Sequence, residues 1–452
     1  MIKRINMLGA LLMGMFLGYA QDARLLTLSD AITYALQSKS DATKAVLDIR
    51  KGDAKIAEVK ASVFPELKIV SNTSYSPLLQ KTVLPGEIFG APGQNIEVSF
   101  GQKWTSTASA QLTQVLFNQS VFTGLKAAKS TKEFYILNKQ LTDEQIIDKV
   151  ATTYYQVYKS QQMLSNLESN LDITQRTVTI IKGLYDAGLA KKIDYDRSVV
   201  ALNNLKANRQ QLVNSRQISE NTLKYIIGMS MDQEITLPED TFQPGVLPEY
   251  DSNYHNTLDN RTELKVLNKQ LELLNWQKKA SIAEYYPSVT LTANYGWLGQ
   301  GEKIPWWHGK NDNVYWSDMS TIGLNINIPV FNGFSTRSKI QQNQIDIEKA
   351  QADLEDSKLA LDMAYKNSVS QLKNSQLAID NQQDNVKLAQ EVMENTQNNY
   401  KFGLATLNDI LDAERDLSDA KNNLTTSRLD YKLAEIEYLK SQGKLKTLNG
   451  NN

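Results

Sequence analysis

The chain has 452 residues, and its 49 lysines and arginines nearly balance 50 aspartates and glutamates, so it carries no basic field that would suit nucleic acid. It contains no cysteine and only two histidines, His255 and His308. This excludes disulfides, thiolate nucleophiles and nearly every histidine-rich metal site. The composition therefore predicts no cofactor, no metal site and no nucleic-acid partner, and it argues against an enzyme.

The N-terminus has the pattern of a secretory signal peptide. Lys3 and Arg4 precede an apolar stretch over residues 5–16, and the small residues Gly18 and Ala20 stand just before Gln21. A membrane anchor would need about 20 apolar residues, and this stretch is shorter. We expect residues 1–20 to be removed and the mature chain to be exported.

In the first half of the mature chain, the sequence pattern predicts a helix over about 27–62 and then a strand at 67–75. A Gly- and Pro-rich loop over 76–103 follows, and after it a strand near 105–117 and a long helical hairpin from 118 to about 228. After a linker at 229–257 the same plan returns: a helix over about 258–284, strands at 289–297 and 322–330 separated by a loop at 298–315, and a second hairpin. The predicted division is a signal peptide at 1–20, a first repeat at 21–228, the linker at 229–257, a second repeat at 258–443 and a tail at 444–452.

The long helices carry an apolar residue at every seventh position. One row runs from Val150 to Tyr185 and the other from Tyr365 to Tyr400, each through six successive positions. A strict seven-residue repeat predicts helices wound left-handedly against neighbours. The row four residues later is mostly Gln, where a dimeric coiled coil would carry Leu. This favours helices that form the wall of a wide tube with water on both sides, and a long solvated coiled coil is the alternative.

Both hairpins are interrupted by nearly the same hexapeptide, YDAGLA at 185–190 and YKFGLA at 400–405. Gly188 and Gly403 stand where a helix end favours positive φ. Thr406 and Asp409 form a T-x-x-D capping box that restarts the second helix. The predicted turn residues at the two hairpin tips are Tyr185, Gly188, Leu189, Tyr400, Gly403 and Leu404.

The four strands alternate apolar and polar residues, as in VTLTANYGW and IGLNINIPV. Closing a barrel takes about eight strands, and open edges do not face lipid. If the apolar face meets lipid, several copies must therefore pool their strands. Tryptophans gather at the strand ends and loops, which predicts interfacial aromatics: Trp104, Trp297, Trp306, Trp307 and Trp316. A soluble sandwich is the alternative for the same strands.

The chain resembles the TolC family of outer-membrane efflux channels over about residues 25–443. The resemblance lies in an order that occurs twice: a helix, [FY]P, two strands, [LV]FN, a long helix, a Y-x-x-G-L turn and a second helix. Its most specific stretches are IPVFNGF at 328–334 and YKFGLATLNDILDAERDLSDAKNNL at 400–424. The resemblance implies a mainly α protein with a membrane β-barrel, assembled as a homotrimer with a twelve-stranded barrel in the outer membrane of a Gram-negative bacterium and a twelve-helix periplasmic tunnel. It also implies the exit duct of a tripartite efflux pump or type I secretion system, joined through a periplasmic adaptor to an inner-membrane transporter.

The same resemblance implies a gate, because two acids just after the second turn form an inward ring at a closed tip in this family. LNDILD supplies Asp409 and Asp412. KKIDYD supplies Asp194 in the first copy, where Arg197 takes the place of the second acid. The capping box accounts for Asp409 equally well.

Two other classes stay open on the sequence. A soluble periplasmic coiled-coil adaptor or scaffold explains the hairpins and the export signal, but not two strand pairs that are each followed by a hairpin. An exported hydrolase would need paired carboxylates, a Ser/His/Asp set or a metal cluster, and none stands out.

Overall fold

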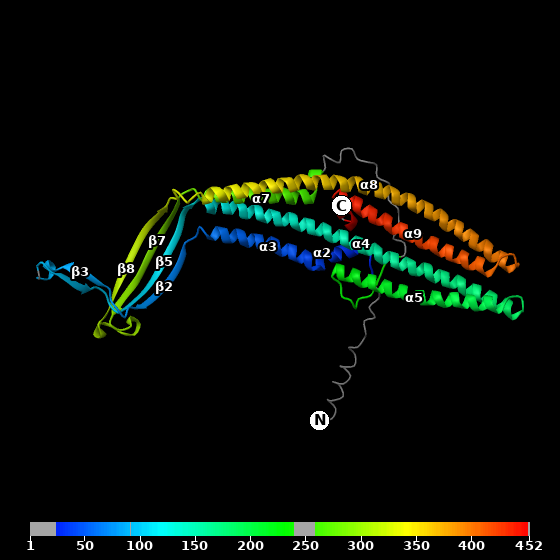
Figure 1. The fold of residues 1–452 in the computed structure, drawn as a ribbon, viewed down its shortest axis with the longest axis horizontal. Coiled ribbons are helices and arrows are strands. Elements are labelled where there is room, and N and C mark those ends of the chain that lie inside the picture. Colours follow the sequence, from blue (N-terminus) through cyan, green and yellow to red (C-terminus); the bar gives the residue numbers. More distant parts are fainter. Residues whose placement is uncertain (1–23, 91, 239–257, 451–452) are drawn as a thin grey trace, which may run out of the picture. The chain divides into compact units, whose positions relative to one another are not determined.

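The computed structural model describes residues 24–90, 92–238 and 258–450. The predicted signal peptide at 1–20 and most of the predicted linker, from 239 to 257, lie outside the described residues. The chain forms two compact units. One consists of residues up to 48, 136–267 and 353 onwards, and the other of residues 49–135 and 268–352 (Figure 1). Each unit combines segments of both predicted repeats.

The second unit contains a four-stranded antiparallel sheet in the order β2-β5-β7-β8. Its strands are β2 (Glu66–Tyr75), β5 (Trp104–Asn118), β7 (Ser288–Gly301) and β8 (Val314–Asn327). The first two lie within one residue of their predicted bounds. The prediction of 322–330 for the last strand was wrong at both ends, because β8 begins inside the predicted loop and stops before Pro329, which has no N–H for the strand ladder.

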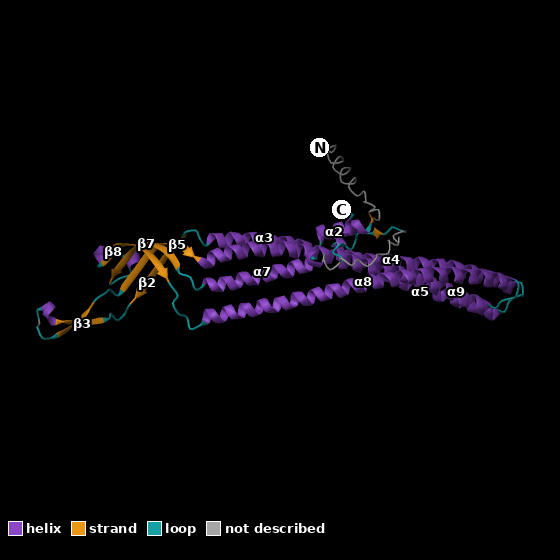
Figure 2. Cartoon of the chain, turned by 90° about the horizontal axis from the view of Figure 1, so that it is seen from above, coloured by secondary structure: helices purple, strands orange, loops and turns teal. Residues whose placement is uncertain are grey.

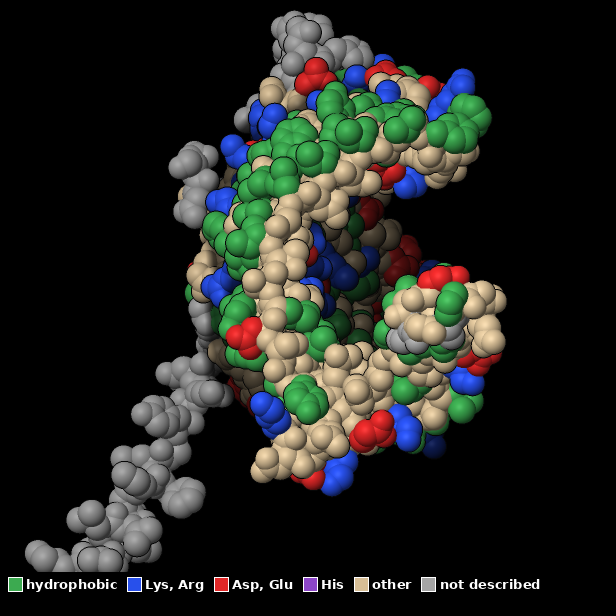
Figure 3. Space-filling view, turned by 90° about the vertical axis from the view of Figure 1, so that its left-hand side faces the viewer, with side chains coloured by type: hydrophobic (Ala, Val, Ile, Leu, Met, Phe, Trp, Pro, Cys, Tyr) green, Lys and Arg blue, Asp and Glu red, His purple; other side chains and the backbone are tan. Residues whose placement is uncertain are grey.

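The register places apolar side chains on one face of this sheet and polar side chains on the other. Opposed residues of antiparallel strands point to the same side. One continuous row across the four strands is Leu67, Leu112, Ala293 and Ile322, and the next row, on the opposite face, is Lys68, Gln111, Asn294 and Thr321. Figure 3 shows hydrophobic side chains gathered along the outer side of a curved surface.

The predicted loop at 76–103 contains a second, separate hairpin that the sequence analysis missed. Strand β3 (Lys81–Pro85) pairs with β4 (Asn95–Ser99), and η1 (Gly86–Phe89) follows β3. Lys81 forms an ion pair with Glu97 across the hairpin at 3.0 Å. The strands are only five residues long and one ends in proline, so their alternation gives little signal.

The two long helical hairpins have the predicted architecture (Figure 2). Their helices are α4 (Gln119–Asp186), α5 (Lys192–Ile227), α8 (Ser335–Lys401) and α9 (Leu407–Ser441). The single helix predicted over 27–62 was wrong, since it is broken at Lys39, whose backbone is extended, into α2 (Leu28–Ser38) and α3 (Ser40–Ala61). The helix predicted at 258–284 is the short turn η2 (Leu258–Asn260) followed by α7 (Thr262–Ala283). No described helix is both long and apolar enough to cross a bilayer.

Side-chain contacts give the order of neighbouring helices in each unit. In the first unit the order is α5-α4-α9-α8, through Arg209 with Glu168, Thr174 with Glu414, and Leu372 with Tyr431. In the second unit the order is α3-α4-α7-α8, through Asp53 with Lys132, Glu133 with Lys269, and Lys278 with Gln344. The helices of the second unit therefore follow the same order as the strands.

The seven-residue seams are buried over most of their length. Val150, Val157, Tyr365, Leu372 and Ile379 are each at most 2% exposed. The residues beside the second seam are small and polar: Ser368 and Ser375 are buried, and each hydroxyl donates to a backbone carbonyl three residues earlier in its own helix. The seams are thus narrow, as the glutamine-rich flanks predicted.

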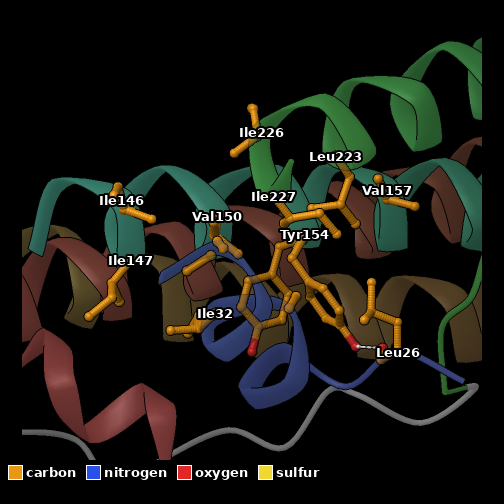
Figure 4. Close-up of a cluster of buried hydrophobic side chains, with 14 of the residues drawn as sticks. Leu26, Ile32, Ile146, Ile147, Val150, Tyr154, Val157, Leu223, Ile226 and Ile227 are labelled. Carbon is orange, nitrogen blue, oxygen red and sulfur yellow. Dashed lines mark hydrogen bonds between the residues drawn. The ribbon is translucent and has the colours of Figure 1, made fainter. Parts of the chain in front are cut away.

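The main core of the first unit joins α2, the middle of α4, the end of α5, the later part of α9 and η5 (Leu445–Asn449) (Figure 4). Tyr154 is fully buried there, and its hydroxyl donates to the carbonyl of Leu26 at 3.0 Å. Burial raises the pKa of this phenol. The described part of the linker also packs into this core, and its strand β6 (Ile235–Thr236) pairs in parallel with β1 (Arg24–Leu25).

Candidate functional sites

Both hexapeptides form the same turn at the end of a long helix. Gly188 has a φ of 76° and Gly403 a φ of 75°, the left-handed conformation that glycine adopts without a Cβ clash. The amide of Leu189 donates to the carbonyl of Leu184 at 2.8 Å, and that of Leu404 to Asn399 at 2.9 Å. The two tips lie side by side in Figures 1 and 2.

The tips expose large apolar side chains to solvent. Leu189 is 78% exposed, Leu404 76% and Phe402 80%. The sequence analysis missed Phe402, because comparing the two hexapeptides selects the positions they share, and the counterpart of Phe402 is Ala187. A group of exposed apolar side chains gathered at the end of a hairpin is typical of a protein contact.

The two tip tyrosines lie in different surroundings. Tyr185 stacks on Tyr195 of the same hairpin, with ring centroids 6.0 Å apart and planes 5° from parallel. Tyr400 packs against a cluster that includes Met393 and Ile410, and burial and then the negative charge of Asp194 raise its pKa.

Tyr400 and Asp194 line a cavity of about 620 Å³ between the two tips. Lys191, Arg197 and Lys401 line it too. The space between the hairpins of one chain is therefore mixed in charge and not purely acidic.

Asp409 caps α9. Its carboxylate accepts hydrogen bonds from the amide of Thr406 at 2.7 Å and from the Thr406 hydroxyl at 2.8 Å, and the Asp409 amide donates back to that hydroxyl. The backbone bond, and then the hydroxyl bond, lower the pKa of Asp409. The capping role inferred from the sequence is confirmed, and the carboxylate is ionised at neutral pH.

Asp412 and Asp194 do not cap helices through their side chains. Asp412 is exposed one turn beyond Asp409 and forms an ion pair with Arg415 at 3.2 Å. Asp194 lies in the first turn of α5, whose N-terminus has no side-chain cap. Neither Asp409 nor Asp412 lines the cavity between the tips that Asp194 lines.

The structure adds one acid that the sequence analysis did not select. Glu414 on α9 is 5% exposed and accepts hydrogen bonds from Thr174 and Thr177 on α4, at 3.0 and 2.9 Å. Burial raises its pKa, and the two threonine hydroxyls oppose that shift. Glu414 therefore joins the two hairpins. The only signal for Glu414 in the sequence is its position four residues after the seam residue Ile410, in the polar row that lies beside the seam.

The strand-end aromatics share the apolar face of the sheet. Trp104 opposes Tyr75, with ring centroids 4.7 Å apart, while Trp297 opposes Ala108 and Trp316 opposes Gly299. By the same register rule, all of these side chains point to the side that carries Leu67 and Ile322.

The loop between β7 and β8 folds back onto this face. The indole nitrogen of Trp306 donates to the Thr73 hydroxyl at 2.7 Å, and the ring of Trp306 lies 5.3 Å from that of Trp316. Gly299 makes this possible, because a Cβ there would lie 2.8 Å from both Pro305 and Trp316. Trp307, beside them, is 77% exposed.

A four-stranded sheet with one apolar and one polar face, joined to two long helical hairpins, is the architecture expected of an outer-membrane channel. The chain belongs to the outer membrane efflux protein family, whose sequence profile matches residues 31–229 and 253–443. It is an outer-membrane channel that gives efflux pumps their exit. This favours the channel over the soluble adaptor or scaffold alternative.

Individual relatives agree with the family match. The chain is 23% identical over 381 residues to the outer membrane protein TolC of Salmonella enteritidis, covering 83% of this chain and 76% of TolC. It is 22% identical over 426 residues to the outer membrane efflux protein BepC of Brucella suis, covering 93% and 86%. The outer membrane protein VceC of Vibrio cholerae has the same fold, with a TM-score of 0.71 at 18% identity over 92% of this chain and 96% of VceC.

Proposed function

We propose that three copies of this chain close their sheets into one barrel and form a continuous exit duct. The observation that supports this is the isolated four-stranded sheet, which has one apolar face and two edge strands, β2 and β8. An unpaired strand edge in hydrocarbon leaves backbone groups without partners at several kcal/mol each. Joining β2 of one copy to β8 of the next removes both edges.

The number of copies follows from the size of the lumen. Two four-stranded sheets give eight strands, and a barrel of about eight strands is filled by its own side chains. Three sheets give twelve strands and leave an aqueous lumen lined by the polar face of Lys68, Gln111, Asn294 and Thr321. In this assembly Trp104, Trp297, Trp306, Trp307 and Trp316 form an aromatic belt at one lipid interface.

The mass of the protein in lipid nanodiscs tests the closure. We expect a particle of three chains, and a stable single chain in lipid would overturn the proposal. Replacing Ile322 on β8 with lysine should prevent membrane assembly, because a charge on the lipid face costs about 2–4 kcal/mol at mid-depth. Thr321→Lys, one residue away on the polar face, is the matched control and should still assemble.

The hairpin tips provide the contact for a periplasmic adaptor that links the duct to an inner-membrane transporter. Leu189, Leu404 and Phe402 supply exposed apolar side chains on rigid turns, which suits a hydrophobic contact. Drugs or other exported substrates then pass from the transporter into the lumen. Purification from native membranes should recover an adaptor with the wild type and lose it with Leu189→Asp and Leu404→Asp.

The acids beside the tips form the gate. In a trimer three copies of Asp409 and of Asp412 surround one narrow axis, with Asp194 nearby, and such a ring attracts cations. Asp412 gives the cleaner test because it does not cap the helix. In planar bilayers, Asp412→Asn should weaken cation selectivity and block by trivalent cations. Asp416→Asn, which removes an equally exposed acid beside the same Arg415, is the control.

If Asp412→Asn and Asp409→Asn both leave selectivity and block unchanged in an assembled trimer, these acids serve only as cap and surface charge. The effect of Asp409→Asn by itself is harder to interpret, because asparagine at that position keeps only part of the hydrogen bonding that starts α9.

A further inference from the structure

A cavity of about 250 Å³ lies between α4 and α7 in the second unit, close to where these helices meet the strands. Its walls combine aromatic, apolar and basic side chains: Phe122, Lys126, Trp276, Lys279, Ile282 and Tyr286. None of the described residues that line it is acidic. The channel function described above uses none of these residues.

The wall of the cavity adjoins the apolar face of the sheet. Phe117, near the end of β5, opposes Val289 in the register and so lies on the apolar face. The ring of Phe122 is 6.2 Å from that of Phe117, so the apolar surface continues from the strand face onto the wall of the cavity.

Two lysines flank the indole of Trp276 at this place. The ammonium of Lys279 lies 4.3 Å from the ring centroid and that of Lys126 lies 6.0 Å from it. The acids near Trp276 are already engaged: Glu272 accepts from the indole nitrogen and from Ser130 and is paired with Lys269, which lowers its pKa to about 2. Glu284 is paired with Lys339 on α8. The two lysines therefore keep a net positive charge for a ligand.

The depth of the cavity fits the headgroup layer of a bilayer. Phe122 and Tyr286 lie within about one turn of the strand ends, and Lys126 and Lys279 lie about one turn further. Helical side chains lean toward the N-terminus, so Lys126 on α4 leans back toward the strands, while Lys279 on α7 leans away from them toward Trp276. The first turn of α4, which supplies Gln119 and Phe122 to the wall, adds the positive end of the helix dipole.

The cavity also stays open in the assembled channel. Helix α4 has α3 on its other side, and α7 has α8, so both walls belong to the two inner helices of the chain. A neighbouring copy joined at β2 and β8 would not cover it.

From these contacts we propose that the cavity between α4 and α7 binds the phosphate of an anionic phospholipid in the leaflet on the helix side of the sheet. Lys126 and Lys279 pair with the phosphate, Trp276 and Tyr286 lie at the interface, and the acyl chains extend along Phe117 and Val289 on the strand face. The bound lipid fixes the depth of the barrel in the membrane where the strands become helices.

Native mass spectrometry of the full-length channel in non-ionic detergent tests this with dioleoyl phosphatidylglycerol as the probe and phosphatidylcholine as the neutral comparison. We expect tighter retention of phosphatidylglycerol. Lys126→Gln with Lys279→Gln should weaken it by about thirtyfold, because each lysine near an anionic lipid surface contributes roughly 1 kcal/mol and 1.4 kcal/mol corresponds to a factor of ten. Lys126→Arg with Lys279→Arg should restore retention.

The matched control is Lys55→Gln with Lys349→Gln, which removes the same charge from exposed lysines of α3 and α8 in the same unit. The oligomer mass in the same spectra shows whether each variant has assembled. Wild-type retention by the assembled Lys126→Gln, Lys279→Gln variant would overturn the proposal, as would equal loss in the control.

A second arm separates a lipid from a free anion. The difference in tryptophan fluorescence between the wild type and Trp276→Phe reports on the cavity. Phosphatidylglycerol with brominated acyl chains should quench this signal, whereas sodium phosphate and glycerol 1-phosphate at the same concentrations should leave it unchanged. An equal response to the soluble phosphates would identify a free-anion site and refute lipid binding.

Discussion

The left-handed turn at the first hairpin tip allows a direct test of why its glycine is needed. Gly188 has a φ of 76°, and a Cβ added there would meet no atom within 4 Å. Any cost of Gly188→Ala therefore comes from the backbone and not from packing. For a non-glycine residue in this conformation the cost is about 1–2 kcal/mol.

Gly183, five residues earlier in α4, is a matched control. It is helical, has no positive φ, and an added Cβ would again meet nothing within 4 Å. Alanine there should stabilise the helix by roughly 0.5–1 kcal/mol, because glycine is the poorer helix former. The same change, Gly to Ala, is thus expected to have opposite signs at two nearby positions.

Hydrogen–deuterium exchange of the peptide covering residues 180–192, in the assembled channel, measures both effects. Gly188→Ala should reduce protection of the Leu189 amide, which donates to Leu184, by about five- to thirtyfold, since 1.4 kcal/mol corresponds to a factor of ten. Gly183→Ala should raise protection about two- to fivefold. Equal effects of the same sign in both variants would refute the backbone explanation.

Three further changes have expected outcomes. Glu414→Gln should stabilise the contact between α4 and α9 at pH 7, because burial raises the pKa of the Glu414 carboxyl in the folded chain. The contribution of Glu414 to the free energy of unfolding is therefore fully favourable below its ordinary pKa of about 4.5, and it is lost as the pH rises through the folded pKa. Exchange of residues 166–180 at pH 5 and pH 7.5 should show that pH dependence in the wild type and not in the variant; lower protection of the variant at pH 7.5 would contradict this. Gly299→Ala should displace the Pro305–Trp306 turn and cost about 1–3 kcal/mol in thermal stability, with changed tryptophan emission, whereas unchanged emission would show that the sheet absorbs the methyl group. Thr406→Ala should cost about 1 kcal/mol through loss of the capping box, seen as faster exchange at the start of α9, and Ser at that position should restore protection.

The parts of the fold that could be predicted are those with a sustained period. The seams ending at Tyr185 and Tyr400 each repeat through six successive positions, and the structure buries most of their residues. Alternation in the strands gave the apolar face correctly. The end of β8 was misplaced because Ile328 and Val330 continue the alternation beyond Asn327, while Pro329 between them prevents further ladder pairing.

The parts that could not be predicted depend on contacts between distant segments. Nothing near Glu414 in the sequence indicates that Thr174 and Thr177 lie opposite it, 237 to 240 positions away. The break at Lys39 is similar. Its side chain lies over the ring of Tyr225 and donates to the Tyr225 carbonyl, a contact that exists only once α5 has packed beside α2. Local sequence gives elements, whereas these residues are selected by their tertiary neighbours.

The contacts that α9 makes with α8 and with α4 bear on how the channel opens. Within the second hairpin, α8 and α9 meet through apolar seam residues such as Leu372 and Tyr431, and one hydrogen bond between the Ser368 and Ser441 hydroxyls, at 3.0 Å, also crosses the pair. Between the hairpins, α4 and α9 are joined toward the tips by side-chain hydrogen bonds, of Glu414 with two threonines and of Asn166 with Asn422 and Thr425. Further from the tips, Leu429 and Ile436 of α9 pack into the same apolar core as α4.

Groups in such hydrogen bonds can exchange their protein partners for water at a small net cost, about 0.5–1.5 kcal/mol for each bond. Separating an apolar seam is less favourable, because it exposes apolar side chains to water. We therefore expect the hydrogen-bonded part of the α4–α9 boundary near the tips to separate before the apolar seam between α8 and α9 when the tips part. Because the chain has no cysteine, single disulfides can test this directly. A disulfide engineered between α4 and α9 at positions 166 and 422 should hold the channel closed in bilayer recordings, while one between α8 and α9 at 372 and 431 should leave opening intact. Equal inhibition by both would show that the hairpins themselves must unzip.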